Sequence, residues 1–174
     1  FEMTKHEYYT YTKEELLNKG AKLPVIVMED NAAVFQSMAE EMAEEIKKNN
    51  AEGKKTVFIC PVGPVGQYPY FVEMVNQEKI SLKNVWFINM DEYLDDDKKW
   101  VPETHPLSFR GFMNRTVYSK IAPELVMPEE QRVFPDPENV EYIPQLIENW
   151  AVWIFASAVS VLTDMLPLMK QMRL

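Results

Sequence analysis

Short apolar runs alternate with amphipathic segments along the first half of the chain. Three runs read as buried strands, at residues 22–28, 56–60 and 85–89. Between the first two runs, apolar side chains recur at helical spacing from Phe35 to Ile46, with glutamates turned outward. A second helix is predicted at residues 68–79. This alternation predicts an α/β fold, a Rossmann-like open parallel sheet with flanking helices and right-handed crossovers.

The pattern predicts two further helices in the second half. They cover residues 105–121 and 136–150. Gly111 is a weak point of the first helix. Asp136 is expected to cap the second, and Pro144 to kink or break it. The polar loop at residues 94–104 is of the kind that carries function. We expect a single domain over residues 1–174.

The negative net charge of the chain limits the kinds of molecule that it can bind. The net charge is −9, which argues against nucleic acid and against an anionic membrane surface, because both attract basic faces. A small phosphorylated ligand is compatible with this net charge, since one pocket can be locally positive. The apolar run at residues 151–162 is shorter than the roughly 20 residues that span a bilayer.

Cysteine and histidine usage gives no sign of a disulfide framework or a metal site. Cys60 is the only cysteine, which fits a reducing cytoplasm. His6 and His105 are far apart and lack metal-site spacing. Residues 1–16 contain no apolar stretch of the signal-peptide type. We therefore expect a cytoplasmic protein without metal or cofactor.

The first candidate site is the stretch CPVGPVGQYP, between a predicted strand and a predicted helix. Ligands of open α/β sheets bind beyond the carboxyl ends of the strands. Gly63 and Gly66 allow close backbone approach, and the following helix offers N–H groups to an anion. The alternative is a plain turn, because two prolines remove donors and the loop has no Ser, Thr or Lys. The candidate phosphate-binding residues are Pro61, Val62, Gly63, Pro64, Val65 and Gly66.

The second candidate site is the stretch NMDEY at the end of the third predicted strand. A half-desolvated carboxylate at a strand end has a raised pKa and can act as a general base. Asp91 and Glu92 are the candidate catalytic residues. The alternative is that both merely begin the acidic loop that continues through Asp95, Asp96 and Asp97.

The stretches FINMDEYL and HPLSFRGFM together resemble the glucosamine-6-phosphate deaminase (isomerase) family, relatives of 6-phosphogluconolactonase. The resemblance covers residues 24–150. It implies an enzyme that moves a proton between C2 and C1 of an amino-sugar phosphate and releases ammonia, leaving fructose 6-phosphate. Asp91 would carry the proton, and the Pro/Gly loop would correspond to the phosphate loop, although PVGPVG replaces a hydroxyl-rich sequence. His105 matches the start of a family helix, where capping and ligand contact are both open.

The chain changes character at Trp150, after which charged residues are nearly absent. Family members continue with a strand and a loop of the type GxxGHxAFNEP, whose His–carboxylate pair opens the sugar ring. Restoring one G in the codons after Trp150 permits the reading GGVDICFGGVGVNGHVAFNEADA. We therefore hypothesise that residues 151–174 are out of frame, so that a frameshift truncates the family half at residues 22–150. The alternative is an amphipathic C-terminal helix, because Val152, Phe155, Val159 and Leu162 recur at helical spacing.

The missing loop predicts little or no deaminase activity for this chain, since it lacks the His partner and the cationic phosphate ligands of the family. Two other functions stay open. One is a non-catalytic fragment that self-associates through an exposed sheet edge or the tail. The other is a lactonase or isomerase that acts on another phosphosugar.

Overall fold

The computed structural model describes residues 12, 14–15, 26–138, 140–149 and 154–156. The chain divides into two compact units, Phe1–Asn31 and Ala32–Leu174. In the first unit, the Thr12 N–H donates to the Glu15 carboxylate (2.8 Å), and the Glu15 N–H donates to the Thr12 hydroxyl (3.2 Å). These reciprocal bonds form a capping box. The predicted domain boundaries at residues 22, 150 and 151 stay predictions.

A four-stranded sheet lies at the centre of the second unit. Its strands are β1 (Thr56–Cys60), β2 (Val85–Asn89), β3 (Arg132–Val133) and β4 (Ile154–Ala156). Their order is β3-β2-β1-β4, and every neighbouring pair is parallel. The predicted α/β fold with a parallel sheet is confirmed. The strands predicted at residues 56–60 and 85–89 have these same bounds in the structure.

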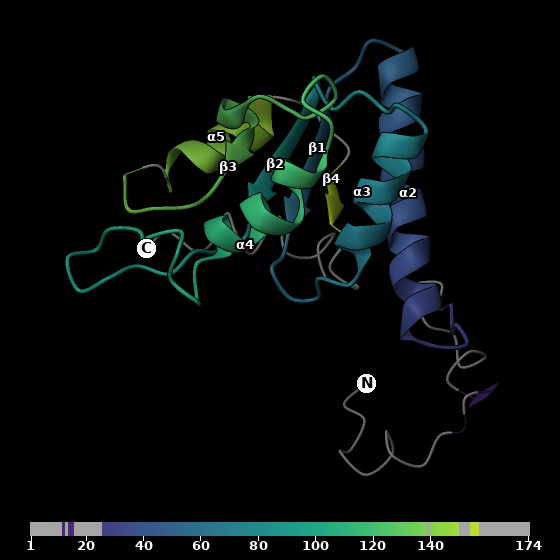
Figure 1. Ribbon diagram of the computed structural model, residues 1–174, viewed down its shortest axis with the longest axis horizontal. Helices are drawn as coiled ribbons and strands as arrows, with labels where there is room; N and C mark the ends of the chain where they lie inside the picture. Colours follow the sequence, from purple (N-terminus) through teal and green to yellow (C-terminus); the bar gives the residue numbers. More distant parts are fainter. Residues whose placement is uncertain (1–11, 13, 16–25, 139, 150–153, 157–174) are drawn as a thin grey trace. The chain divides into compact units, whose positions relative to one another are not determined.

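Helices flank the sheet. The structure describes α2 (Asn31–Ala51), α3 (Gln67–Gln77), α4 (Phe109–Thr116) and α5 (Tyr142–Asn149), and the short 3-10 helices η2 (Tyr118–Lys120) and η3 (Glu129–Gln131). In Figure 1, α2 and α3 lie side by side, and their buried residues join the same cluster. None of the described helices is both long and apolar enough to cross a membrane.

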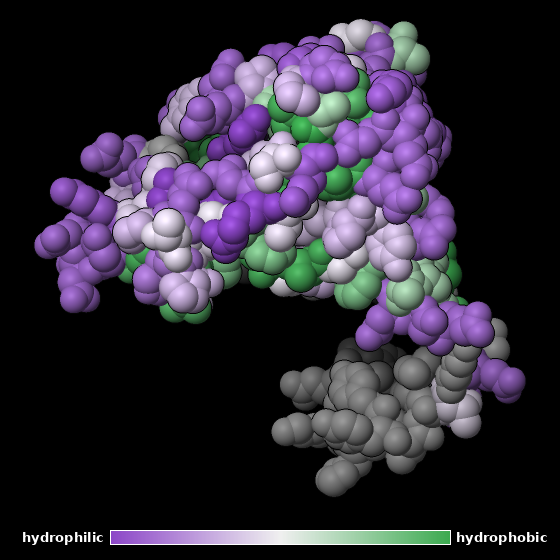
Figure 2. All heavy atoms as spheres, in the orientation of Figure 1, coloured by the Kyte–Doolittle hydropathy of each residue, from purple (hydrophilic) through white to green (hydrophobic). Residues whose placement is uncertain are grey.

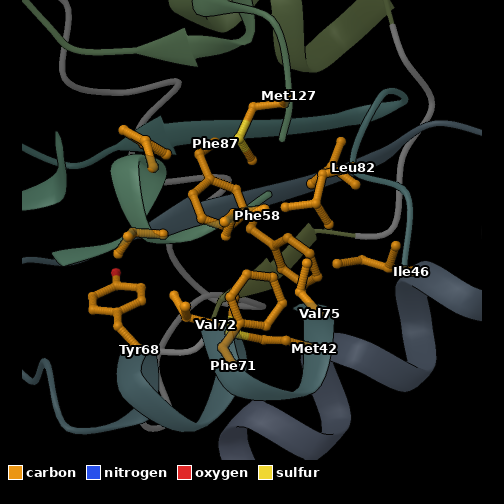
Figure 3. Packing of buried hydrophobic residues seen from close by; sticks show 14 of the residues in the cluster. Met42, Ile46, Phe58, Tyr68, Phe71, Val72, Val75, Leu82, Phe87 and Met127 are labelled. Carbon is orange, nitrogen blue, oxygen red and sulfur yellow. The ribbon is translucent and has the colours of Figure 1, made fainter. Parts of the chain in front are cut away.

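The main core lies between the sheet and α2, α3 and α4. Alternate strand residues point to one face of a sheet, and Phe58 of β1 and Phe87 of β2 share this face. Their rings meet edge to face, with centroids 5.8 Å apart. Figure 3 shows Phe71 of α3 packed beneath them, and all three rings are 0% exposed. Burying each of these side chains contributes about 1.5–3 kcal/mol.

The opposite face of the sheet carries a smaller cluster. Val57 of β1 and Ile88 of β2 pack there against Ile143 of α5, with Trp86 and Val133 partly buried beside them. Apolar residues therefore line both faces of β1 and β2, as the nearly continuous apolar runs predict.

The strand predicted at residues 22–28 is wrong for its described part. Residues 26–28 have no regular secondary structure, and Ile26 and Val27 are 77% and 47% exposed. These residues belong to the unit Phe1–Asn31, and the sheet contains none of them. An apolar run does not form a strand where it finds no partner strand to complete its backbone hydrogen bonds.

The helix predicted from residue 136 begins instead at Tyr142. The Asp136 carboxylate accepts from the Glu138 N–H (2.7 Å), which makes a turn rather than a helix cap. Pro144 is the third residue of α5. Its missing N–H causes no break there, because the first four N–H groups of a helix have no partner within it.

Gly111 is a close-approach position rather than a weak point. The helix predicted at residues 105–121 begins at Phe109, after the N-cap Ser108, whose hydroxyl accepts from the Gly111 N–H (3.1 Å). A β-carbon at Gly111 would collide with the backbone carbonyl of Glu103. Glycine therefore allows the 94–104 loop to lie directly on α4. This loop extends to the left in Figure 1, and hydrophilic residues cover the same region in Figure 2.

The alternative of a C-terminal helix is wrong at residues 154–156, which form β4 and pair with Val57–Ile59 of β1. The other residues of that prediction, Val152, Val159 and Leu162, lie outside the described residues. The reading-frame hypothesis for residues 151–174 stays a prediction.

Candidate active site

The two predicted sites lie at the same edge of the sheet. Cys60 and Asn89, the last residues of β1 and β2, are register partners. The Met90 N–H continues this pairing by donating to the Cys60 carbonyl (3.1 Å). The Pro/Gly loop follows Cys60 directly, and Asp91 follows Met90. The geometry thus brings together two segments that are some thirty residues apart in the sequence.

A side-chain bond also fixes the end of β2 on its other side. Asn89 is 1% exposed, and its amide nitrogen donates to the Val133 carbonyl of β3 (3.0 Å). The carboxyl ends of β1, β2 and β3 are therefore tied together where Asp91 leaves the sheet. A rigid strand end is a better support for a functional side chain than a free loop is.

Asp91 is exposed, and the pKa of its carboxyl lies above the ordinary value. Partial burial is the larger cause, because desolvation disfavours the charged form, and the negative charge of Glu92 adds to it. A carboxyl that binds its proton more tightly is a stronger base once ionised. The arrangement can therefore take up and return a proton at a neighbouring carbon atom.

Glu92 lies in a very different environment from its neighbour. Its side chain is 0% exposed, although its backbone makes the residue as a whole partly exposed. Oε1 accepts from the Phe109 N–H (2.9 Å), and Oε2 accepts from the Arg110 N–H (2.7 Å). The Ser108 hydroxyl donates to Oε2 (3.3 Å), and the Arg110 Nε lies 3.3 Å from the same oxygen. Both carboxylate oxygens thus face the N-terminus of α4.

The Pro/Gly loop is held by its own residues. The Tyr68 hydroxyl donates to the Pro61 carbonyl (2.6 Å), and the Gln67 side-chain amide donates to the Pro64 carbonyl (3.0 Å). Val62 and Val65 pack against the core. Gly63 is exposed and has φ +156°, and the peptide bond to Pro64 is cis.

Packing against α2 explains why residue 66 is a glycine. A β-carbon there would overlap the ring of Phe35 of α2. Gly66 is also the N-cap of α3, and no side chain caps that helix end. An uncapped helix N-terminus is compatible with an anion, and the loop itself supplies no cationic side chain. Phosphate binding by this loop stays a prediction.

His105 is exposed and takes part in a local turn. Its Nδ1 accepts from the Leu107 N–H (3.2 Å), and its carbonyl accepts from the Ser108 N–H (3.0 Å). These bonds form a turn that precedes α4, whose N-cap is Ser108. Contact with a ligand stays a prediction.

Other reactive groups near the strand ends are poorly suited to chemistry. Cys60 is completely buried, and burial raises the pKa of its thiol, so the thiol stays protonated. Burial likewise raises the pKa of the Tyr68 hydroxyl. Within the described ranges, no group of three or more His, Cys, Asp and Glu residues could hold a metal ion.

The walls of an open hollow of about 500 Å³ do not include Asp91 or the Pro/Gly loop. It is lined by Asp97, Lys98, Lys99, Trp100, Asp136, Pro137 and Glu138. The hollow is thus formed by the 94–104 loop and the turn at residues 136–138.

The sequence did not predict Ser108 and Arg110 as part of the site. Arg110 donates to the Val101 carbonyl (2.9 Å), and its guanidinium stacks on the Trp100 ring at 4.3 Å. The one available signal was Ser108 at a helix N-cap. The contact with Glu92 joins positions 16 to 18 residues apart, which no local pattern reveals.

Comparison with known proteins gives one consistent group of relatives. The chain is 35% identical over 100 residues to a glucosamine-6-phosphate deaminase of Phocaeicola vulgatus, covering 56% of this chain and 36% of that protein. It is 32% identical over 100 residues to the enzyme of Bacteroides thetaiotaomicron, with 56% and 35% coverage. For Borrelia garinii subsp. bavariensis the values are 34% over 86 residues, with 48% and 30% coverage. The chain therefore spans about a third of the length of these curated relatives.

A solved structure has the same fold. It is described as a monomeric glucosamine-6-phosphate deaminase, and the TM-score is 0.61 at 19% identity, covering 75% of this chain and 52% of that chain. No family model matches the chain. Over the matched part of its length, the chain is therefore similar to curated glucosamine-6-phosphate deaminases.

Proposed function

We propose that the chain is a glucosamine-6-phosphate deaminase/isomerase-like protein in which Asp91 is the general base. The observation that carries this proposal is the position of Asp91. It leaves the end of β2 beside the Pro/Gly loop that leaves β1, because Met90 is bonded to Cys60. The curated relatives are named for this reaction.

The proposed chemistry uses Asp91 as a shuttle. Its carboxylate takes a proton from C2 of the opened amino-sugar phosphate and delivers it to C1, which leaves an imine at C2. Water then hydrolyses this imine, so that its oxygen becomes the C2 ketone of fructose 6-phosphate and ammonia leaves. Burial and the charge of Glu92 raise the pKa of this carboxyl. A base with a pKa closer to neutral pH makes both halves of the transfer more efficient.

The Pro/Gly loop, with the N-terminus of α3 behind it, is the proposed site for the sugar phosphate. The N–H groups at a helix start favour a phosphate. The stretch from Pro61 to Gly66 contains no Ser, Thr or Lys. The loop therefore binds phosphate only through backbone groups, and we expect weak affinity.

The chain by itself is proposed to be impaired. No histidine follows His105 in the sequence, so a His–carboxylate pair after β4 is absent from this chain. General acid–base catalysis typically contributes about 10²–10⁴-fold in rate. We therefore expect little or no release of ammonia from glucosamine 6-phosphate by the 174-residue chain.

The test uses two proteins from the parent gene, the present chain and a longer chain in which one G is restored after the Trp150 codon. We expect the longer chain to release ammonia, and the substitution Asp91→Asn in it to lower kcat by at least about 100-fold. The control substitution is Asp96→Asn, an exposed acid in the loop that follows.

Three results would contradict the proposal. Full activity of the Asp91→Asn protein would remove Asp91 from the mechanism, and ammonia release by the present chain would disprove its impairment. A longer chain that acts on other sugar phosphates but not on glucosamine 6-phosphate would favour the lactonase or isomerase alternative.

A further inference from the structure

Two adjacent carboxylates at the end of β2 have opposite environments. Asp91 is exposed, whereas the Glu92 side chain has no exposed surface. A buried carboxylate is stable only where hydrogen bonds and a positive charge replace its water. Glu92 has both, and apart from one hydrogen bond from the Tyr93 N–H they come from the start of α4.

The bonds to Glu92 form a clasp, which we define as Glu92, Ser108, Phe109 and Arg110. Two backbone N–H groups of the first turn donate to its two oxygens, at 2.9 and 2.7 Å. These are N–H groups that a helix cannot satisfy within itself, and a negative charge at this end also interacts well with the helix dipole. Glu92 therefore replaces solvent at the N-terminus of α4.

Arg110, the cation of the clasp, also makes contacts with residues outside the clasp. The Arg110 Nε lies 3.3 Å from Oε2 of Glu92, and Arg110 also contacts the Val101 carbonyl and the Trp100 ring. Glu103 lies 3.8 Å from the same guanidinium. We therefore expect these contacts to keep Arg110 in place when the charge of Glu92 is removed, so that a substitution at Glu92 tests the clasp rather than the folding of the loop.

We propose that Glu92 is a positioning residue for Asp91 rather than a second catalytic residue. Asp91 lies directly between Met90, whose N–H donates to the Cys60 carbonyl, and Glu92, which belongs to the clasp. The chain is therefore fixed on both sides of Asp91, at the sheet by Met90 and at α4 by Glu92. The backbone that carries the exposed Asp91 carboxylate is thereby fixed beside Cys60, where the Pro/Gly loop begins.

Glu92 has no free oxygen to offer a substrate in this arrangement. Its two oxygens accept four hydrogen bonds, including one from the N–H of Tyr93 (2.8 Å). A role in proton transfer would require these bonds to break and the side chain to leave a buried site. The assignment of a positioning role rests on the proposed function of Asp91, but the clasp is measurable without any substrate.

The experiment uses NMR on the full 174-residue chain and on its Glu92→Gln and Glu92→Asp variants. Carbon-detected spectra follow the Asp91 carboxyl through a pH titration, and hydrogen exchange is measured at the Phe109 and Arg110 amides. Glutamine keeps the shape of glutamate but loses the charge and one acceptor. We expect Glu92→Gln to lower the pKa of Asp91, because a nearby negative charge is removed, and to speed exchange of the two amides by about tenfold or more.

Glu92→Asp distinguishes the effect of the negative charge from the effect of side-chain length, because it keeps the carboxylate and shortens the side chain by one methylene. We expect the Asp91 pKa to stay above its ordinary value in this protein, while exchange at Phe109 and Arg110 still becomes faster. The matched control is Asp96→Asn, which removes one exposed charge from the neighbouring loop and should change neither quantity.

Two outcomes would overturn the positioning role. One is an unchanged Asp91 pKa in Glu92→Gln with faster amide exchange, which would make Glu92 a helix cap alone. The other is unchanged exchange at both amides, which would show that the clasp does not form. If Glu92→Gln does not fold, the exchange rates in Glu92→Asp decide. Failure of sugar phosphates to bind would count against the proposed function of Asp91 and would leave these results as they are.

Discussion

At the scale of the residue, Asp91 and Glu92 show how position along one strand end separates two identical functional groups. One carboxylate faces outward and binds its proton more tightly than usual, and the other is enclosed by N–H donors and Arg110. The sequence NMDEY presents both as equal candidates. Only the packing of α4 against the strand end distinguishes them.

The raised pKa of Asp91 predicts a pH-dependent effect of Asp91→Asn on stability. The folded protein holds the proton more tightly than the unfolded chain, whose carboxyl has the ordinary pKa of 3.8. The wild type therefore loses stability, relative to Asp91→Asn, as pH rises through the folded pKa. We expect equal stability near pH 3 and a gain of at most about 0.5 kcal/mol for Asp91→Asn at pH 7, because the group is exposed and screened.

Urea unfolding of both proteins at the two pH values measures this difference. Asp96→Asn is the control, and its effect on the free energy of unfolding should be the same at both pH values. An Asp91→Asn protein that is less stable than the wild type at pH 7 would show that the ionised carboxylate makes a stabilising contact instead.

At the scale of the element, the strands β1 and β2 and the helix α3 were predictable because each has a continuous apolar run or a helical period of its own. β3 was not, because it has only two residues, Arg132 and Val133, and is a strand solely by pairing with Phe87 and Ile88. The run at residues 22–28 failed for the converse reason. Its pattern is that of a strand, but its described residues have no partner in the sheet.

The start of α5 gives a prediction at this scale. Pro144 lies in the first turn, so Pro144→Ala restores no hydrogen bond and only gives the unfolded chain more freedom. We expect the free energy of unfolding to fall by up to about 1 kcal/mol. A proline inside a helix that began at residue 136 would instead cost about 3 kcal/mol, and its replacement would stabilise the protein.

Denaturant unfolding of Pro144→Ala beside the exposed control Gln145→Ala distinguishes the two cases. A stabilisation of about 1 kcal/mol or more, which is the scale of helix propensities, would place Pro144 in the helix interior and contradict the observed start at Tyr142.

At the scale of the whole molecule, all strands of the described sheet are parallel, in the order β3-β2-β1-β4. Their carboxyl ends therefore lie along the same edge of the sheet. That shared edge brings together the two predicted site segments, which are distant in sequence. It was predictable in outline, since alternating strands and helices imply parallel pairing. The clasp at α4 and the seat of Gly66 against Phe35 depend on tertiary contacts, so no pattern in the sequence could show them.

The reading frame after Trp150 determines the last strand of the described sheet. β4 pairs with β1 at residues 154–156, where the family resemblance implies a strand. Parallel pairing uses backbone groups, so a strand of different apolar residues can occupy the same position. The sequence of the parent gene decides whether residues 151–174 are read out of frame.

The most direct test of the site is an NMR titration of the 174-residue chain with glucosamine 6-phosphate, with unphosphorylated glucosamine as the control ligand. We predict that the phosphorylated sugar shifts the amide signals of Gly63, Gly66 and Asp91 together, at millimolar concentration, and that glucosamine alone leaves the two glycine signals unchanged. Shifts confined to the hollow around Trp100, or none at the strand ends with either sugar, would contradict the claim that Asp91 and the Pro/Gly loop form one sugar-phosphate site.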